Sequence, residues 1–268
     1  MIPITNTKLH DKYNQVYKNG AYETFWSFLP YEESNGIIYM GGRWEGKNIL
    51  EIGCGEGDLA SLMAYHGGVV TGIDYSEEAI NIANRKYNLP NVIFQCADYK
   101  KIKNKYDRVV MQGVLEHMDN VYDTLKYIKE HLLTVDGDII SSSPSFLNIR
   151  GIIWMTLQLL FDAPMSLTDI HNLNIRDFEI FAEGLNMKLN YISCEHDWGN
   201  GGKLIADLKK RIPKALSDIN MSNKYEKLIE WLEKNLSYFD YNSELIFKKP
   251  ENAGAVMVYK LRKEINSF

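Results

Sequence analysis

The chain has 268 residues, 45% of them hydrophobic and 24% charged, and its formal net charge is −5 at pH 7. This composition is typical of a globular protein of one large domain, with or without a cap, and the acidic balance argues against a nucleic-acid backbone as the main partner. Three cysteines without C-x-x-C spacing argue against a disulfide framework and a zinc site. The sequence shows neither a signal peptide nor an apolar run long enough to span a bilayer, so we expect a cytoplasmic protein without a membrane span.

The first predicted element is an aromatic helix over residues 7–29. It should end before Pro30, because the residue that precedes a proline is pushed out of the helical region. Three tyrosines of this helix could close over a bound ligand, although an aromatic stripe at this spacing more often belongs to a core: Tyr13, Tyr17 and Tyr22. We take Tyr17 as a candidate ligand contact and residues 1–44 as an N-terminal helical lid.

A buried strand over residues 47–53 then breaks into a tight turn, and a helix follows the turn. The turn contains three glycines: Gly53, Gly55 and Gly57. A second apolar strand, residues 69–74, ends in Asp74. A strand, a glycine turn and an acid at the tip of the next strand are typical of a site for a nucleotide ribose. The spacing is G-x-G-x-G rather than the G-x-G-x-x-G of pyrophosphate-binding turns, which favours a ligand with adenosine and an amino acid, such as S-adenosylmethionine.

The next segments continue the alternation of strands and helices. Ser76 is expected to cap a helix that ends at Tyr87, and Asp119 is expected to open a helix with one apolar face. Three more strands are predicted: residues 92–95, 106–111 and 138–142. Strands and helices that alternate in this way indicate a parallel, doubly wound α/β sheet.

The pattern changes after Ser143, where an apolar and aromatic segment begins. The expected elements are a helix over 175–185, a strand over 187–194, two helices within 201–237 and a last strand over 253–261. We treat the whole chain as a single domain with a cofactor-binding core at residues 45–145. On this reading, residues 147–172 and 195–250 are helical insertions that form a cap over the substrate.

Four motifs follow one another in the core. They are Glu51-Ile-Gly-Cys-Gly-Glu-Gly57, Gly72-Ile-Asp-Tyr-Ser76, Cys96-Ala-Asp98 and Val114-Leu-Glu-His-Met118. With these motifs, residues 45–145 resemble class I S-adenosylmethionine-dependent methyltransferases of the small-molecule type, similar to the O-methyltransferases of ubiquinone biosynthesis. The resemblance implies a seven-stranded Rossmann-like sheet, mainly parallel with an antiparallel last strand. It also implies S-adenosylmethionine as the cofactor and S-adenosylhomocysteine as the product.

The candidate cofactor residues follow the strand ends, because ligands of an open α/β sheet bind outside the carboxyl ends of its strands. Asp74 should accept hydrogen bonds from the ribose hydroxyls, Asp98 resembles the family's acid near the adenine, and Glu51 should contact the ammonium of the methionine arm. The other expected contacts are Gly53, Cys54, Gly55 and Gly57 in the turn, Tyr75 and Ser76 beside the adenine, Ala97 and Tyr99 for backbone contact and stacking, and Gln112 and Gly113 along the methionine arm. Cys54 and Cys96 are expected to be small buried residues and not nucleophiles.

His117 is the candidate catalytic residue and a further cofactor contact. It follows the fourth strand, where the methyl group should project, and its near-neutral titration would let it take a proton from an acceptor hydroxyl. The competing interpretation is that His117 packs near the cofactor or orders the loop. Glu116 is expected to be a helix cap or a loop acid. No spacing of histidines, cysteines and acids resembles a metal site.

Three classes of function remain open at this stage. The first is transfer of a methyl group to oxygen or nitrogen of a small-molecule acceptor. The second is a methyltransferase for RNA or protein, which the residues Met111-Gln-Gly-Val-Leu115 disfavour, because amino-group methylation of nucleobases usually needs Asn/Asp-Pro-Pro-Tyr/Phe there. The third is a non-catalytic module that binds S-adenosylmethionine and regulates a partner. The acceptor and the oligomeric state do not follow from the sequence.

Overall fold

The computed structural model describes residues 18, 31–163, 165–166, 169–221, 225–241 and 249–263. The chain divides into two compact units. The first unit comprises Met1–Ser143, Ile175–Tyr191 and Val258–Phe268, and the second comprises Pro144–Asn174 and Ile192–Met257. The predicted aromatic helix over residues 7–29, with Tyr13, Tyr17 and Tyr22, lies outside the described residues.

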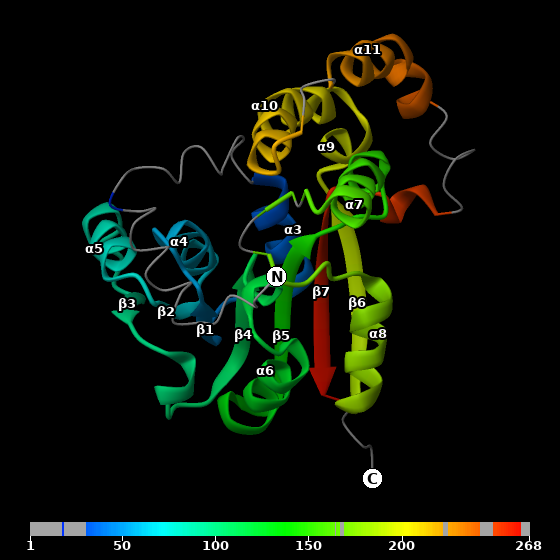
Figure 1. Cartoon of the computed structure of the whole chain (residues 1–268). Helices are drawn as coiled ribbons and strands as arrows, with labels where there is room; N and C mark the ends of the chain where they lie inside the picture. Colours follow the sequence, from blue (N-terminus) through cyan, green and yellow to red (C-terminus); the bar gives the residue numbers. More distant parts are fainter. Residues whose placement is uncertain are drawn as a thin grey trace. The chain divides into compact units, whose positions relative to one another are not determined.

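A seven-stranded sheet has the order β3-β2-β1-β4-β5-β7-β6 (Figure 1). The strands are β1 (Asn48–Ile52), β2 (Val69–Asp74), β3 (Val92–Cys96), β4 (Tyr106–Gln112), β5 (Leu133–Pro144), β6 (Met187–Cys194) and β7 (Val256–Lys263). Strands β1 to β5 pair in parallel, whereas β7 points the opposite way (Figure 1). This confirms the predicted doubly wound sheet with an antiparallel last strand. The order reverses between β1 and β4, which is the position where sheets of this kind bind ligands.

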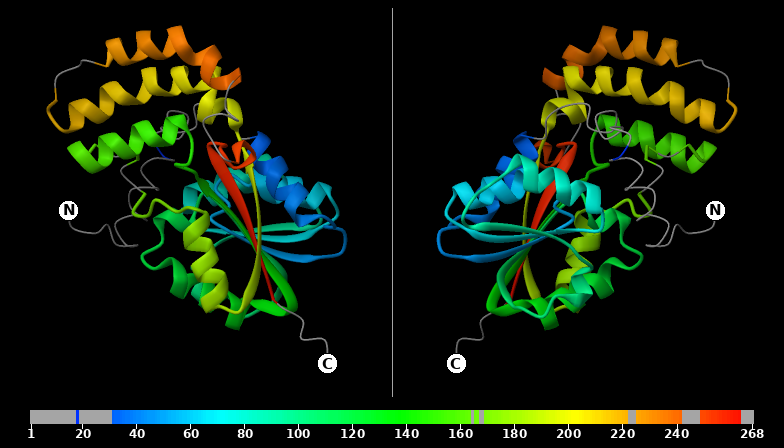
Figure 2. Two further views of the ribbon diagram at one scale, coloured as in Figure 1. Left: turned by 90° about the vertical axis from the view of Figure 1, so that its right-hand side faces the viewer. Right: turned by 90° about the vertical axis from the view of Figure 1, so that its left-hand side faces the viewer.

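Helices cover both faces of the sheet in the first unit. They are α3 (Tyr31–Gly41), α4 (Asp58–Tyr65), α5 (Glu77–Lys86), α6 (Val121–Tyr127) and α8 (Ile175–Gly184). Figure 2 shows α3, α4 and α5 on one face and α6 and α8 on the other. With both faces covered, the central strand β1 is buried from Ile49 to Ile52, as expected for a parallel strand between two helical layers.

The start of α6 corrects one prediction. The side chain of Asn120, and not that of Asp119, accepts a hydrogen bond from the backbone N–H of Asp123 at 3.0 Å and caps the helix. Both residue types are good helix caps, so the pattern alone did not separate the two neighbours. After Tyr127 the helix continues as one π-helical turn, η3 (Ile128–Leu132), which keeps Ile128 and Leu132 fully buried.

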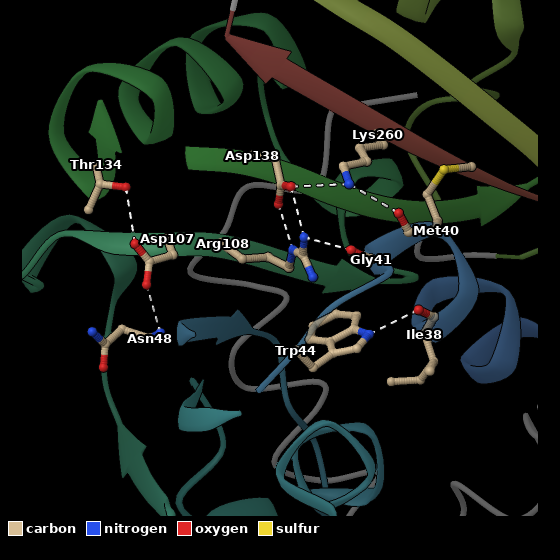
Figure 3. Close-up of polar contacts among 10 residues, drawn as sticks. All are labelled: Ile38, Met40, Gly41, Trp44, Asn48, Asp107, Arg108, Thr134, Asp138 and Lys260. Carbon is tan, nitrogen blue, oxygen red and sulfur yellow. Dashed lines mark hydrogen bonds and ion pairs between the residues drawn. The ribbon is translucent and has the colours of Figure 1, made fainter. Parts of the chain in front are cut away.

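A buried ionic network ties the last turn of α3 to the middle of the sheet (Figure 3). The guanidinium of Arg108 donates to both carboxylate oxygens of Asp138, at 2.6 and 2.9 Å, and Lys260 lies 3.2 Å from the same carboxylate. Arg108 and Lys260 also donate to backbone carbonyls of α3, those of Gly41 and Met40. The Arg108 guanidinium lies 4.3 Å from the ring centre of Trp44. Bidentate pairing fixes the direction of a side chain as well as its charge, so the network holds α3 against β4, β5 and β7.

The second unit is helical apart from the strand ends that enter it. Its helices are α7 (Ile149–Phe161), α9 (His196–Asn200), α10 (Gly202–Asp218) and α11 (Glu226–Tyr241). Trp154 of α7 is fully buried against Leu204 and Leu208 of α10, so this unit has a core of its own. The predicted pair of helices within 201–237 corresponds to α10 and α11, and α9 was not expected. Within the ranges that the structure describes, no helix has the length and apolarity needed to cross a membrane.

Candidate active site

The glycine turn between β1 and α4 is closed by backbone hydrogen bonds. The N–H groups of Gly53 and Cys54 both donate to the carbonyl of Ile73 at the end of β2, at 2.8 and 2.9 Å. Gly53 and Gly57 have positive φ angles of 74° and 86°, which glycine adopts without the strain of a side chain. A Cβ on Gly57 would lie 2.5 Å from the ring of Phe94, so space as well as conformation requires glycine there.

Asp74 is tied directly to this turn. Its Oδ2 accepts a hydrogen bond from the N–H of Gly55 at 2.9 Å, and its Oδ1 accepts one from the N–H of Ser76 at 2.8 Å. A carboxylate can accept about four hydrogen bonds, so two backbone donors fix its direction while it can still receive ligand hydroxyls. The structure therefore brings together the turn and the acid that the sequence singled out, at the carboxyl ends of β1 and β2.

Ser76 caps α5, as expected. It is fully buried, and its hydroxyl accepts a hydrogen bond from the N–H of Ala79. Its N–H donates to Oδ1 of Asp74 and so helps to orient that acid. Its contact with the adenine stays a prediction.

Glu51 is a buried acid with an unsatisfied oxygen. It is 2% exposed, and its Oε2 has no hydrogen-bond partner among the residues that the structure describes. Burial, together with the negative charges of Asp74 and Asp58, raises the pKa of Glu51 well above its usual value, and a hydrogen bond from the backbone of Ala60 opposes this. Leaving such an oxygen unpaired costs about 1–3 kcal/mol. An ammonium group is the chemical partner that would satisfy it.

The end of β3 places Tyr99 and corrects the prediction for Cys96. Tyr99 is buried, the centre of its ring lies 5.6 Å from that of Tyr127 in an edge-on contact, and its hydroxyl pairs with that of Thr124. Helix α6 carries both of these partners, and its packing against η1 (Tyr99–Lys101) turns the ring inward. The stacking of Tyr99 on a ligand stays a prediction. Cys96 is exposed and not buried, because β3 is the edge strand of the sheet.

Three other predicted residues lie beside β3. The carboxylate of Asp98 accepts from the N–H of Lys100 at 2.9 Å, and the N–H of Ala97 donates to the carbonyl of Asp74 at 3.0 Å. Tyr75 is half-buried, and burial next to Asp98 and other acids raises its pKa to about 12. Its phenol therefore stays neutral at physiological pH, and solvent still reaches part of its side chain.

Cys54 lies in the turn as expected. The residue is buried, and burial raises the pKa of its thiol well above the usual value. A thiol that keeps its proton is a poor nucleophile, so Cys54 is a packing residue of the turn.

The loop after β4 carries the remaining predicted residues. Gly113 has a φ angle of 62° and donates its N–H to the carbonyl of Ser142 at 3.2 Å. His117 is half-buried at the end of a single 3-10 turn, η2 (Leu115–His117). Glu116 is a loop acid, one of the two roles expected, but it is buried: its Oε2 accepts a hydrogen bond from the hydroxyl of Ser143 at 3.2 Å.

Sequence reasoning missed Glu33, Ser142 and Ser143. The Ser142 hydroxyl donates to Oε1 of Glu33 at 2.5 Å, across 109 positions of the chain. The available signal was the run of three serines at the end of β5, all of which are buried. Buried hydroxyls need hydrogen-bond partners, so this run indicated polar partners that the sequence could not identify.

The predicted residues thus gather along the carboxyl edge of β3, β2, β1 and β4, all in the first unit, with Tyr17 outside the described residues. Across the part of the chain that is described, no group of histidines, cysteines and acids could hold a metal ion. The unsatisfied oxygen of Glu51 fits a ligand with an ammonium group.

Comparison with known proteins gives the same picture. A protein family described as a methyltransferase domain matches residues 25–177, more than half of the 268 residues. The chain is 33% identical over 87 residues to ubiquinone biosynthesis O-methyltransferase of Coxiella burnetii, and the aligned segment covers 31% of this chain and 37% of that protein. It is 27% identical over 140 residues to malonyl-[acyl-carrier protein] O-methyltransferase of Bacillus cereus, and that alignment covers 50% of this chain and 48% of that protein. The chain thus spans about a third to a half of the curated relatives it matches.

Solved structures share the fold. A crystal structure of an S-adenosylmethionine-dependent methyltransferase from Listeria monocytogenes covers 87% of this chain and 98% of that one, with a TM-score of 0.53 and 15% identity. The plantazolicin methyltransferase BpumL, crystallised with S-adenosylhomocysteine and a monoazolic desmethylPZN analogue, matches over 97% of this chain and 91% of that one, with a TM-score of 0.50 and 18% identity.

Proposed function

The chain belongs to the methyltransferase domain family, and we propose that this S-adenosylmethionine-dependent enzyme moves a methyl group to an oxygen or nitrogen of a small-molecule acceptor. The observation that carries the proposal is the pair of acids at the glycine turn. Asp74 is oriented by two backbone N–H groups, and Glu51 is buried with an unsatisfied oxygen. Together they offer one acid for a ribose and one for an ammonium.

Several of the predicted residues at the carboxyl edge are assigned a part in holding the donor. Asp74 accepts hydrogen bonds from the ribose hydroxyls, and Glu51 pairs with the ammonium of the methionine arm. Tyr75 and Asp98 contact the adenine, while Gln112 and Gly113 line the methionine arm. Glycines at positions 53, 55 and 57 have positive φ angles, which shape the tight turn that receives the ligand.

The donor supplies a sulfonium methyl group whose leaving group is a neutral thioether, so the chain's own residues have mainly to align the reactants and exclude water. His117 stands at the end of η2 beside the donor residues of β4. In its neutral form it takes the proton from the acceptor hydroxyl as the oxygen attacks the methyl carbon and the bond from that carbon to sulfur breaks.

The second unit is the part of the chain that we assign to the acceptor. It has a core of its own between α7 and α10, so it is a folded module and not a set of loops. We assign to residues 147–172 and 195–250 the task of covering the acceptor. We keep residues 1–44 as a lid. Both curated relatives described above are O-methyltransferases by name, which favours oxygen over nitrogen as the methylated atom.

Calorimetric titration with S-adenosylhomocysteine tests the donor site. Asp74→Ala should lower the affinity about 100-fold or more, because it removes two hydrogen bonds to a charged acceptor, each contributing about 1.5–3 kcal/mol. The matched control is Asp107→Ala, which removes an acid of β4 that accepts from the N–H of Asn48. That variant should bind normally. Undiminished binding by Asp74→Ala would refute the site.

A second variant tests the base. His117→Ala should lower turnover about 10²- to 10⁴-fold, the usual contribution of general base catalysis, while the affinity for S-adenosylhomocysteine stays nearly unchanged. Turnover is measured as transfer of a labelled methyl group from S-adenosylmethionine to a panel of hydroxyl-bearing metabolites. Equal losses of turnover and donor affinity would instead show a structural residue.

A further inference from the structure

The loop from Gln112 to His117 joins the two halves of the proposed site, with donor residues at its start and the base at its end. Two adjacent serines of β5 hold the two ends of this loop. The hydroxyl of Ser142 donates to Oε1 of Glu33 at 2.5 Å, and that of Ser143 donates to Oε2 of Glu116 at 3.2 Å. Successive side chains of a strand point to opposite faces, so the two serines reach acids on opposite sides of the sheet.

The Ser142 contact belongs to the donor end of the loop. Glu33 lies in the first turn of α3, next to Ser34. The hydroxyl of Ser34 donates to Oε1 of Gln112 at 3.3 Å. The first turn of α3 therefore contacts the Gln112 amide through Ser34 and β5 through Glu33. The position of this turn sets the orientation of the amide that a donor meets.

The Ser143 contact belongs to the catalytic end. Glu116 directly precedes His117 in η2, and its Oε1 lies 3.6 Å from the position that a Cβ on Gly113 would take. The acid is thus held between the glycine at the start of the loop and the strand β5. Because Leu115 is fully buried as well, the turn that carries His117 has little freedom to shift while the Ser143 bond is intact.

Both acids are buried. Glu33 is 8% exposed and Glu116 is 4% exposed. Burial raises the pKa of Glu33, and its hydrogen bond from the Ser142 hydroxyl opposes this. Helix α3 is already anchored at its other end by Arg108 and Lys260. Burying a carboxylate against a neutral hydroxyl, as at Glu33, is unfavourable, and residues kept at such a cost are often functional.

We propose that the two serine–acid contacts are separate positioning devices: Glu33 with Ser142 orients Gln112 and sets donor affinity, and Glu116 with Ser143 sets the position of His117. The proposal rests on the donor site and the base assigned above. Neither acid is assigned a contact with the reacting atoms, so both are positioning residues. The contacts come from neighbouring positions of one strand, and each can be removed by deleting a single hydroxyl.

The experiment compares Ser142→Ala with Ser143→Ala, each the matched control of the other. Two quantities are measured on the full chain: the Kd of S-adenosylhomocysteine by calorimetry, and the Cε1–Hε1 cross-peak of His117 by NMR. Ser142→Ala should raise Kd about tenfold, the effect of one hydrogen bond to a charged group, and leave the His117 cross-peak in place. Ser143→Ala should move that cross-peak and leave Kd within about twofold.

The conservative variants Glu33→Gln and Glu116→Gln keep the volume of each acid and should reproduce the effects of Ser142→Ala and Ser143→Ala respectively. If a serine variant fails to fold, the corresponding glutamine variant takes its place in the test. The proposal is overturned if both pairs change both quantities, or if neither pair changes its own. Asp74→Ala is titrated with S-adenosylhomocysteine in parallel, to distinguish failure of the proposed function from failure of this inference. If Asp74→Ala keeps its affinity, the proposed donor site is wrong. If Asp74→Ala loses affinity but the two serine variants behave alike, only the proposal about the serine–acid contacts is wrong.

Discussion

The middle of the sheet and its carboxyl edge bury charge in opposite ways. Around Asp138, the two cations Arg108 and Lys260 meet one carboxylate and two carbonyls of α3 (Figure 3). At the carboxyl edge, the contacts of Glu33 are with neutral side chains, and Glu51 accepts from a backbone N–H while its other oxygen is unsatisfied. Paired buried charges hold the fold, whereas poorly compensated buried acids are typical of functional sites.

Breaking the paired region should have the largest effect on folding. Asp138→Ala leaves the Arg108 guanidinium buried without its carboxylate, which typically costs about 3–5 kcal/mol. Urea denaturation of the variant should show this loss in the free energy of unfolding. The folded fraction should still bind S-adenosylhomocysteine, because the two donor acids Glu51 and Asp74 lie on β1 and β2 and not on β5. Arg176→Ala, which removes an exposed pair with Glu179, is the control and should change stability by about 0.5 kcal/mol or less. A loss in Asp138→Ala no larger than in this control would contradict the comparison.

Replacing Glu51, the acid with the unsatisfied oxygen, should raise stability and weaken ligand binding. Glu51→Gln removes a buried negative charge, so the free energy of unfolding without ligand should rise by about 1 kcal/mol near pH 8. The affinity for S-adenosylhomocysteine should fall about tenfold, since the ammonium loses a charged partner. Thermal unfolding and calorimetry measure the two quantities, with the exposed Glu45→Gln as the control. A variant that is less stable than the parent and binds equally well would show that Glu51 serves the fold.

The same acid gives a pH dependence with a definite sign. The folded carboxyl of Glu51 keeps its proton to higher pH than the unfolded one, whose pKa is near 4.5. Its contribution to stability is therefore fully present below that value and is lost as the pH rises through the raised pKa. The parent protein should lose stability over this range, and Glu51→Gln should lack that part of the loss. An identical pH profile of stability for both proteins would contradict the assignment.

Sequence reasoning was strongest where the chain determines structure locally. The glycine turn, the position of Asp74 and the cap at Ser76 each depend on residues a few positions apart or on adjacent parallel strands. It was weaker where a distant element decides the outcome. Tyr99 turns inward because of Tyr127 and Thr124 on α6, and Cys96 is exposed because β3 is an edge strand.

The buried acids show the limit most clearly. Glu33 meets Ser142 across 109 positions, and no period or motif in either segment indicates the other partner. The raised pKa of Glu51 likewise depends on the burial of its side chain. The sequence motif gives the position of this acid two residues before the glycine turn, but it does not predict how deeply the acid is buried. Motifs therefore predict which residues face a ligand, while the electrostatic state of those residues needs the packed structure.

A crystal structure of the protein with S-adenosylhomocysteine tests the central claim most directly. We predict the ribose hydroxyls within hydrogen-bond distance of the Asp74 carboxylate and the ammonium within hydrogen-bond distance of Oε2 of Glu51, at the carboxyl ends of β1 and β2. Protein side chains filling that space, or the ligand bound away from both acids, would contradict the account.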